Sequence, residues 1–456
     1  MKILVKESLL LPVLFLLGVC IAVAGPLRLN QEEDSVVIPS GLTDYALVQV
    51  GSSLYVCWTE STYEQGSIVL ARVDLERMEA REVFREGFTE EKVMSPALAV
   101  HGDQIELVWL LRKGRGRKSF HNVEFLSVDS SSKEARQRQS LEYGFQRRNI
   151  ELHSTSRGLF LVGSSTPGSR QAMRLRLFKR DSGKWLSAEG PVSVGSYDQQ
   201  PSLRGGEEYL HLAWIRDGKV HVARSSDGEE WSEAQALSTG GAREPLLLSG
   251  ENQELALVWL ENIGVKSCLV RLATSPDEGE SWWHAPHEIR LEGTRCHLEM
   301  GFSRGTEHFL IYHYRNHDDP CEKLEFCIMS SDWRRERLDL FPEEVCGRSL
   351  SPSVLLGDNL LYVTWRMRRG KETSLVMNYS EFPGVKWLSS PVEFLKSEGK
   401  AVYVGPKLVS LGEQMFAVYF VYRASSGPFQ KSLQRGNLIL RRLKTRFAHH
   451  EEVNTG

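Results

Sequence analysis

The chain has 456 residues and a formal net charge of −3 at pH 7, and its length alone would suggest about three domains. It contains no recognisable nucleic-acid-binding module, and no segment after the N-terminus approaches the ~20 apolar residues that cross a bilayer. We therefore expect no nucleic-acid partner and no membrane span.

The N-terminus has the features of a secretion signal. Lys2 and Lys6 precede an apolar run from Leu9 to Val23, and small residues stand where signal peptidase would cleave, after Ala24. The sequence predicts that residues 1–24 are removed and that the protein is secreted or periplasmic.

Tryptophans recur along the rest of the chain at a fixed spacing. Ten of the eleven fall into two series whose members are about fifty residues apart. The first series is Trp58, Trp109, Trp214, Trp259 and Trp365, with Gly163, Tyr312 and Tyr419 in matching places, and the second is Trp185, Trp231, Trp282, Trp333 and Trp387. A period of this size is typical of an array of one repeated unit.

Each unit can be divided into four short strands. In the fourth unit, the alternating segments 201–203, 210–214 and 220–224 are followed by a last strand near Trp231, with polar turns between them. A four-stranded unit of this length is a propeller blade, so the sequence predicts an all-β fold with a single β-propeller over residues 25–447. Proline recurs at the expected first residue of the innermost strands, where no ladder hydrogen bond is lost, as Pro96, Pro201, Pro245, Pro352 and Pro406.

The repeat predicts eight blades. Seven is the alternative, because the third unit is weakly patterned and the first lacks the proline. The last unit lacks an outer strand, and residues 35–38, ahead of the first unit, form a spare one. We expect this N-terminal strand to complete the last blade and close the ring, which leaves residues 448–456 as a polar tail.

The most specific local motif is a turn between the third and fourth strands of a unit. It reads Ser-Pro-Asp-Glu-Gly-Glu-Ser-Trp over residues 275–282, and residues 225–231 form a version one residue shorter. This motif resembles the Asp-box of sialidase-like propellers with BNR repeats. The resemblance implies a structural role, in which the aspartate accepts hydrogen bonds from turn amides and the tryptophan packs beneath, for Ser225, Asp227, Gly228, Trp231, Ser275, Asp277, Gly279 and Trp282.

The same resemblance raises the possibility of a sialidase-type glycoside hydrolase. Enzymes of that family hold the substrate carboxylate with three arginines, the first of which stands in an Arg-Ile-Pro triplet near the mature N-terminus. This chain has Val37-Ile38-Pro39 there, and sialidases have six blades. A carboxylate clamp without that arginine loses bidentate hydrogen bonds, which weakens the assignment of an enzyme.

Six cysteines remain once the leader with Cys20 is removed, an even number in an oxidising compartment. Four cluster around the sixth unit, and we expect disulfides, of open connectivity, only among Cys296, Cys321, Cys327 and Cys346. Cys57 and Cys268 lie on predicted interior strands of distant blades. No metal-ligand spacing is recognisable, so we expect neither a metal nor another cofactor.

Charged residues are predicted to sort between the two faces of the ring. Loops between the second and third strands, and between successive blades, emerge on one face and are basic, whereas the other turns are acidic. Four arginines precede innermost strands and are candidate ligand-binding residues at the central funnel, namely Arg148, Arg243, Arg295 and Arg348.

The same rim carries candidates for acid and base chemistry. Asp198 and Glu244 are possible acid or base residues, and Tyr403 is a possible nucleophile. A structural role is the alternative for each, because a catalytic pair requires a separation that sequence does not give.

Three functions fit this pattern. The first is a secreted, monomeric propeller that binds an anionic glycan on its basic central face. The second is an exo-acting glycosidase on an anionic sugar, and the third is a non-enzymatic scaffold for a protein partner.

Overall fold

Thirty-five strands and no helix make up the part of the chain that the computed structural model describes. The described residues are 28–30, 35–40, 42–61, 65–89, 91–113, 120–130, 135–141, 145–165, 173–188, 197–206, 208–250, 254–264, 266–285, 288–304, 307–315, 322–329, 335–339, 348–357, 360–369, 372–381, 386–387, 391–397, 401–412, 414–423 and 436–443. The expected signal peptide and the tail at 448–456 lie outside these ranges. No helix long and apolar enough to cross a bilayer occurs within them.

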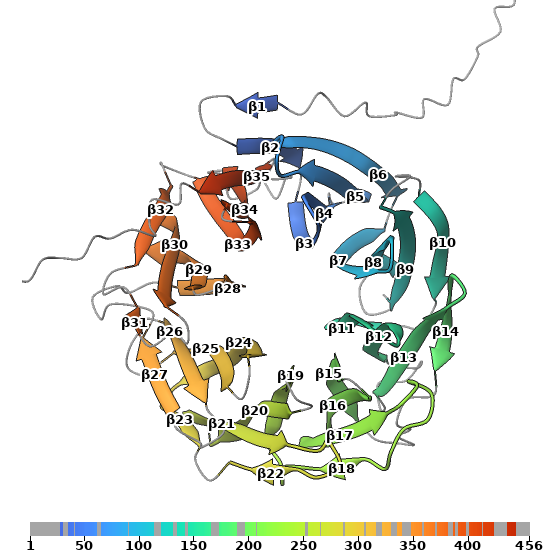
Figure 1. Ribbon diagram of the computed structural model, residues 1–456, viewed down its shortest axis with the longest axis vertical. Coiled ribbons are helices and arrows are strands. Elements are labelled where there is room, and N and C mark those ends of the chain that lie inside the picture. Colours follow the sequence, from blue (N-terminus) through green and yellow to red (C-terminus); the bar gives the residue numbers. More distant parts are fainter. Residues whose placement is uncertain are drawn as a thin grey trace, which may run out of the picture.

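The strands form eight antiparallel sheets arranged as blades around a central opening (Figure 1). The prediction of an eight-bladed propeller is confirmed. In blades one to four, from the innermost strand outward, the strands are β3 (Leu42–Val50), β4 (Ser53–Ser61), β5 (Gln65–Asp74) and β6 (Glu79–Thr89); β7 (Lys92–His101), β8 (Gln104–Lys113), β9 (Phe120–Asp129) and β10 (Ala135–Leu141); β11 (Phe145–Thr155), β12 (Gly158–Ser165), β13 (Arg174–Asp181) and β14 (Lys184–Ala188); β15 (Asp198–Gly205), β16 (Leu210–Arg216), β17 (Lys219–Ser225) and β18 (Gln235–Ala236).

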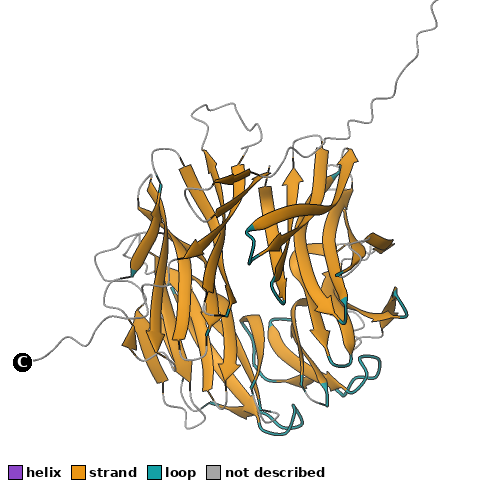
Figure 2. Ribbon diagram, turned by 45° about the horizontal axis from the view of Figure 1, so that its top comes forward, coloured by secondary structure: helices purple, strands orange, loops and turns teal. Residues whose placement is uncertain are grey.

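Blades five and seven carry an extra short strand beside their third strand. The strands of blades five to seven are β19 (Ala242–Ser249), β20 (Leu255–Ile263), β21 (Ser267–Ser275), β22 (Trp283–His284) and β23 (Ile289–Leu291); β24 (Thr294–Arg304), β25 (Glu307–Arg315), β26 (Glu322–Met329) and β27 (Arg335–Asp339); β28 (Arg348–Leu356), β29 (Leu360–Arg369), β30 (Glu372–Glu381), β31 (Lys386–Trp387) and β32 (Val392–Lys396). Figure 2 shows strands joined by loops throughout this part of the chain.

The eighth blade closes the ring with both ends of the described chain. It consists of β33 (Ala401–Leu411), β34 (Gln414–Arg423) and β35 (Gly436–Leu443), and is completed by β2 (Ser35–Ser40) and β1 (Arg28–Asn30). The register pairs Ser35 with Arg441 and Val37 with Ile439. The predicted closure by an N-terminal strand is therefore confirmed.

The hydrophobic core is divided into eight clusters, one at each junction between neighbouring blades. The first tryptophan series lies on the second strands and is fully buried in these clusters. Trp214 of β16, for example, packs against Phe160 and Val162 of the preceding blade. Each indole thus stabilises a junction through burial of its large apolar surface.

Proline lies inside the innermost strands and not at their first residue, which corrects the sequence prediction. Ladder registers shift across Pro96, Pro201, Pro245, Pro352 and Pro406, so each proline occupies a β-bulge, where no ladder donor is required. The residue before the proline has positive φ at Ser95, Gln200, Glu244 and Gly405. We call the face of the ring at which the innermost strands begin the top face, and the bulges lie toward it.

The disulfide predictions are wrong for the cysteine pair that the structure places together. Cys268 of β21 is bonded to Cys296 of β24, across the junction between blades five and six. Both lie near the top ends of their strands, where the third strand of one blade approaches the innermost strand of the next. Cys57 is buried and reduced, Cys327 is buried, and Cys321 and Cys346 lie outside the described residues.

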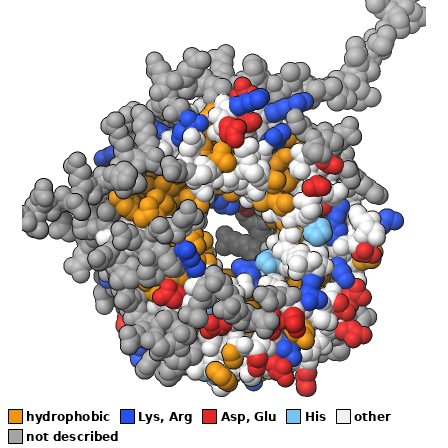
Figure 3. All heavy atoms as spheres, viewed as in Figure 1, with side chains coloured by type: hydrophobic (Ala, Val, Ile, Leu, Met, Phe, Trp, Pro, Cys, Tyr) orange, Lys and Arg blue, Asp and Glu red, His pale blue; other side chains and the backbone are white. Residues whose placement is uncertain are grey.

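Acidic and basic side chains are mixed among the described residues of the ring face that Figure 3 shows. Ion pairs between blades place cations beside two of the acidic turns. Lys179 pairs with Glu229, and Arg224 pairs with Glu280.

Candidate functional site

Polar side chains gather on the top face where the innermost strands of blades five and six meet. Arg243 and Glu244 come from β19, His297 and Glu299 from β24, and His313 from the adjacent β25. We call these five residues the Glu244 cluster. The innermost strands border the central opening, so the cluster lies beside it (Figure 1).

Glu244 is the centre of the cluster because it joins the two blades. Its Oε1 atom accepts a 2.9 Å hydrogen bond from Arg243 and lies 2.9 Å from Nδ1 of His297. Its Oε2 atom accepts from the backbone N–H of Leu298 at 3.0 Å, while its own N–H donates to Gln200 of blade four. The bulge at Glu244, with a φ of 51°, directs this side chain toward the next blade.

Two carboxylate and histidine pairs stand side by side in the cluster. The His297 and His313 rings have centroids 5.0 Å apart. Nδ1 of His313 lies 2.5 Å from Glu299 Oε1, but the direction of the contact does not suit a hydrogen bond. His313 is buried, whereas about half of the His297 side chain is exposed. Only His297 therefore presents its ring to a ligand.

The contacts favour an ionised pair. The hydrogen bond to Glu244 raises the pKa of His297, against an opposing effect of burial. Burial opposes ionisation of Glu244, but the hydrogen bond and charge of His297, with the charge of Arg243, lower its pKa overall. A carboxyl with a lowered pKa is a poor proton donor near neutral pH.

Arg295 adds an exposed cation beside the cluster. It has positive φ at 58° and precedes the disulfide-bonded Cys296, which fixes the backbone at this point. Its side chain is exposed and forms no ion pair with any residue that the structure describes.

The structure does not bring the three proposed catalytic residues together. Asp198 is fully buried in blade four, where Oδ1 accepts 2.8 Å and 3.2 Å hydrogen bonds from Arg216 and Trp214. Burial raises the pKa of this carboxyl, against the two donors. Tyr403 is buried in blade eight and donates its hydroxyl to the carbonyl of Lys396. Neither presents its functional group to the central opening.

Asp198 belongs to a structural device that recurs around the ring. The indole N–H of Trp58 donates to Glu60 and that of Trp259 donates to Glu261. Arginine then pairs with each carboxylate, as Arg85 with Glu60, Arg271 with Glu261 and Arg216 with Asp198. A buried indole N–H requires a hydrogen-bond acceptor. Asp198 supplies that acceptor for Trp214, and this structural role accounts for the acidic residue that the sequence indicated as a possible catalytic acid.

The two other predicted arginines have described backbones but side chains outside the description. Arg148 lies in β11 and Arg348 begins β28. Of the four, Arg243 lies in the Glu244 cluster, and Arg295 lies two residues before His297 on β24.

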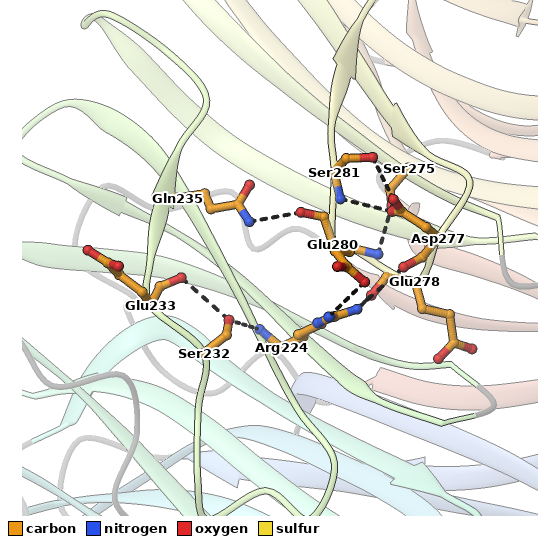
Figure 4. A network of polar contacts seen from close by, with 10 residues as sticks. Arg224, Ser232, Glu233, Gln235, Ser275, Asp277, Glu278, Glu280 and Ser281 are labelled. Carbon is orange, nitrogen blue, oxygen red and sulfur yellow. Dashed lines mark hydrogen bonds and ion pairs between the residues drawn. The ribbon is translucent and has the colours of Figure 1, made fainter.

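The two Asp-box-like turns lie on the opposite face and connect blades. Asp277 accepts hydrogen bonds from the backbone N–H and the hydroxyl of Ser281, and Ser275 donates to Asp277 (Figure 4). Arg224 of blade four reaches across to the carbonyls of Asp277 and Glu278 and to the carboxylate of Glu280. The turn of blade five is thereby held against blade four.

The turn of blade four is held in the same way. Asp227 accepts from the N–H groups of Glu229 and Glu230, which lowers its pKa. Gly228 has a φ of 81° and lies against the Phe160 ring of blade three. These contacts assign the turns to assembly of the ring.

His297 and His313 were not singled out as site residues from the sequence. The signal that could have located them is the repeat itself, because Gln200-Pro201 and Glu244-Pro245 mark the same bulge in successive units. Aligned units place residues 297–299 at the equivalent level of the next blade.

No protein-family model and no curated protein sequence matches the chain. Several solved structures are similar to it. One, from a study of two prolyl endopeptidases, has a TM-score of 0.48 at 12% identity over 84% of this chain, which spans only 55% of that structure's chain. A PL25 ulvan lyase has a TM-score of 0.45 at 9% identity, covering 85% of this chain and 94% of the lyase. The NanB sialidase of Streptococcus pneumoniae has a TM-score of 0.37 at 9% identity, covering 88% of this chain and 68% of the sialidase.

Proposed function

We propose that the protein is an exported β-propeller that binds an anionic carbohydrate on the top face, beside the Glu244 cluster. The observation that carries this proposal is the 2.9 Å contact between Glu244 and His297, which favours the charged form of an exposed imidazole close to Arg295 in the sequence. The Lys2, Lys6 and Leu9 to Val23 leader and the Cys268–Cys296 disulfide support export.

The arrangement suits a carboxylate or sulfate group. Glu244 is already engaged by Arg243, His297 and Leu298, so it competes little for a ligand's cationic contacts. Arg295 offers a planar fork of N–H donors, and the free ring nitrogen of a charged His297 offers one more. A sugar bearing one anionic group could accept hydrogen bonds from both.

Hydrolysis is not part of the proposal. The glycosidase alternative requires an acid and a nucleophile that face one substrate, whereas Asp198 and Tyr403 are buried and lie in different blades. No contact among the described residues favours the scaffold alternative.

The test is retention on an array of sialylated and uronic-acid glycans at fixed ionic strength. We expect the double variant Arg295→Gln/His297→Gln to lose about tenfold or more in apparent affinity, since each charge-assisted hydrogen bond contributes about 1.5–3 kcal/mol. Arg290→Gln is the matched control, because Arg290 is an exposed arginine that pairs with Glu292 away from the cluster.

Arg295→Gln alone provides a second test, because this exposed side chain contributes no described contact within the protein. Unchanged retention of both variants, or equal retention of neutral glycans by the wild-type protein, would contradict the proposal.

A further inference from the structure

The junction between blades two and three carries cations on both of its walls near the top face. On the blade-two wall, Arg112 of β8 alternates with Leu110 and Val108, which belong to the apolar cluster of this junction. Arg112 pairs in register with Lys92 of β7 and with His121 of β9. All three side chains therefore face blade three, at the strand position next to the core residues on the top-face side.

The blade-three wall presents two arginines to the same space. Arg174 and Arg176 alternate with Phe178 on β13, and Phe178 lies in the same apolar cluster. Arg176 pairs in register with Gly163, and Arg174 pairs with Ser165. The two walls thus place Lys92, Arg112, Arg174 and Arg176 opposite one another.

Three of these four cations have no partner among the described side chains. Lys92, Arg112 and Arg174 make no ion pair or hydrogen bond with any described residue, and Nε of Arg112 is buried without an acceptor. The carboxylates of this wall, Glu106 and Asp129, lie at the opposite ends of β8 and β9. There Glu106 is paired with Arg180 at 2.7 Å.

Three other junctions differ from this one. At the junctions of blades eight and one, three and four, and four and five, the arginine near the top face is paired with a carboxylate that also accepts an indole N–H. The third unit has Gly163 in place of the tryptophan, so the indole is missing at this junction. Arg176 occupies the position directly across from that glycine.

We infer that the top of the junction between blades two and three binds a tetrahedral oxyanion, carried by a sulfate ester or a phosphate monoester. Cations from two walls and two rungs approach from several directions, which suits three oxygens on a tetrahedral centre better than the two coplanar oxygens of a carboxylate. The absent indole at Gly163 leaves the walls without the bulky ring that the same position carries in other blades. This site is separate from the Glu244 cluster, which lies at the junction of blades five and six.

Titration calorimetry with three sugars tests the inference. Glucose 6-sulfate and glucose 6-phosphate are the two ester probes, and glucuronate is the carboxylate probe, all at one ionic strength. We expect at least one ester to bind more tightly than glucuronate, and the tighter ester identifies the source of the oxyanion. Arg112→Gln/Arg174→Gln should weaken that binding about tenfold or more.

Gly163→Trp supplies an independent variant that keeps every cation. It restores the indole found in other units and should abolish ester binding, provided that circular dichroism shows an intact β-fold. Arg290→Gln is a control that should leave ester binding unchanged. Each titration is repeated in Arg295→Gln, which weakens any binding at the Glu244 cluster and so separates the two sites. In that background, failure of both esters to bind, equal binding of glucuronate, or full binding when Arg112→Gln/Arg174→Gln is added would overturn the inference.

Discussion

Glu244 Oε1 and His297 Nδ1 lie 2.9 Å apart across the junction between blades five and six, and each favours the charged form of the other. The raised pKa of His297 stabilises the folded protein. This stabilisation is fully present below the pKa that His297 has in the unfolded chain, and it is lost as the pH rises through the pKa that His297 has in the folded protein. The stabilisation from the lowered pKa of Glu244 is present above its unfolded-state pKa and is lost as the pH falls through the folded-state value. The pair therefore contributes most between these two folded-state values.

Replacement of Glu244 by glutamine should lower the pKa of His297, because the charged acceptor is removed while burial still opposes protonation. A titration of the histidine C–H resonances by NMR measures the change. The Arg290→Gln variant should leave the same resonance unaffected. A His297 pKa that stays raised in Glu244→Gln would show that the pair is not coupled.

Two buried histidines and one half-buried histidine predict that the ring loses stability in mild acid. Burial lowers the pKa of His153, His211 and His308 to about 4 each. These side chains stay neutral when folded but bind a proton when unfolded, so the free energy of unfolding should fall from the ordinary histidine pKa down to about 4. Each contributes up to about 1.4 kcal/mol per pH unit in that window.

His153→Gln isolates one of these contributions. Nε2 of His153 accepts the backbone N–H of Gly205 across a junction, and the glutamine carbonyl can also accept without binding a proton. Urea unfolding at pH 7 and pH 5 should show a smaller loss of stability on acidification for the variant. An identical loss of stability in the wild-type protein and the variant would show that His153 does not contribute to the acid sensitivity.

Alanine variants of two glycines distinguish the cost of backbone strain from the cost of disturbing a contact between blades. Gly228 and Gly51 both have positive φ, but a Cβ at Gly228 would lie 2.4 Å from the Phe160 ring, whereas nothing lies within 4 Å at Gly51. Both alanine variants should lose about 1–2 kcal/mol from the left-handed backbone. Gly228→Ala should lose more, because its turn must also move away from blade three. Equal losses in thermal unfolding would show that the turn is not held against that blade.

The disulfide between Cys268 and Cys296 should stabilise the junction beside Arg295. It spans a sequence separation of 28 residues, so a Cys268→Ala/Cys296→Ala variant should lose roughly 3 kcal/mol of unfolding free energy. Non-reducing peptide mapping should recover the two cysteines in one linked peptide pair. Linkage of Cys296 to another cysteine would contradict the pairing.

The repeat made the fold predictable because its signal is large and periodic. Trp58, Trp109 and Trp214 mark the second strands of their blades, and residues 35–38 were expected at the closing edge where β2 is found. The position of the prolines within their strands was harder to predict from the sequence. Pro96 and Pro245 report a bulge, and sequence alone does not distinguish a strand's start from a bulge within it.

The site was only partly predictable, since it depends on contacts between blades. Arg243 and Glu244 were found because they precede an innermost strand, but Asp198 has the same sequence context and is buried beneath Arg216. Cys268 and Cys296 were assigned to separate groups because their junction brings a third strand against the next blade's first strand. Those distances follow from the packing angle of neighbouring sheets, which the one-dimensional repeat does not encode.

The pairing of β2 with β35 has a consequence for biosynthesis. β2 emerges early from the ribosome, but its hydrogen-bonding partner at Gly436–Leu443 is synthesised about 400 residues later. During that interval the edge of β2 is open, and a chain interrupted before Gly436 never acquires the partner strand. Only a chain translated through Leu443 can therefore complete the final blade and close the ring.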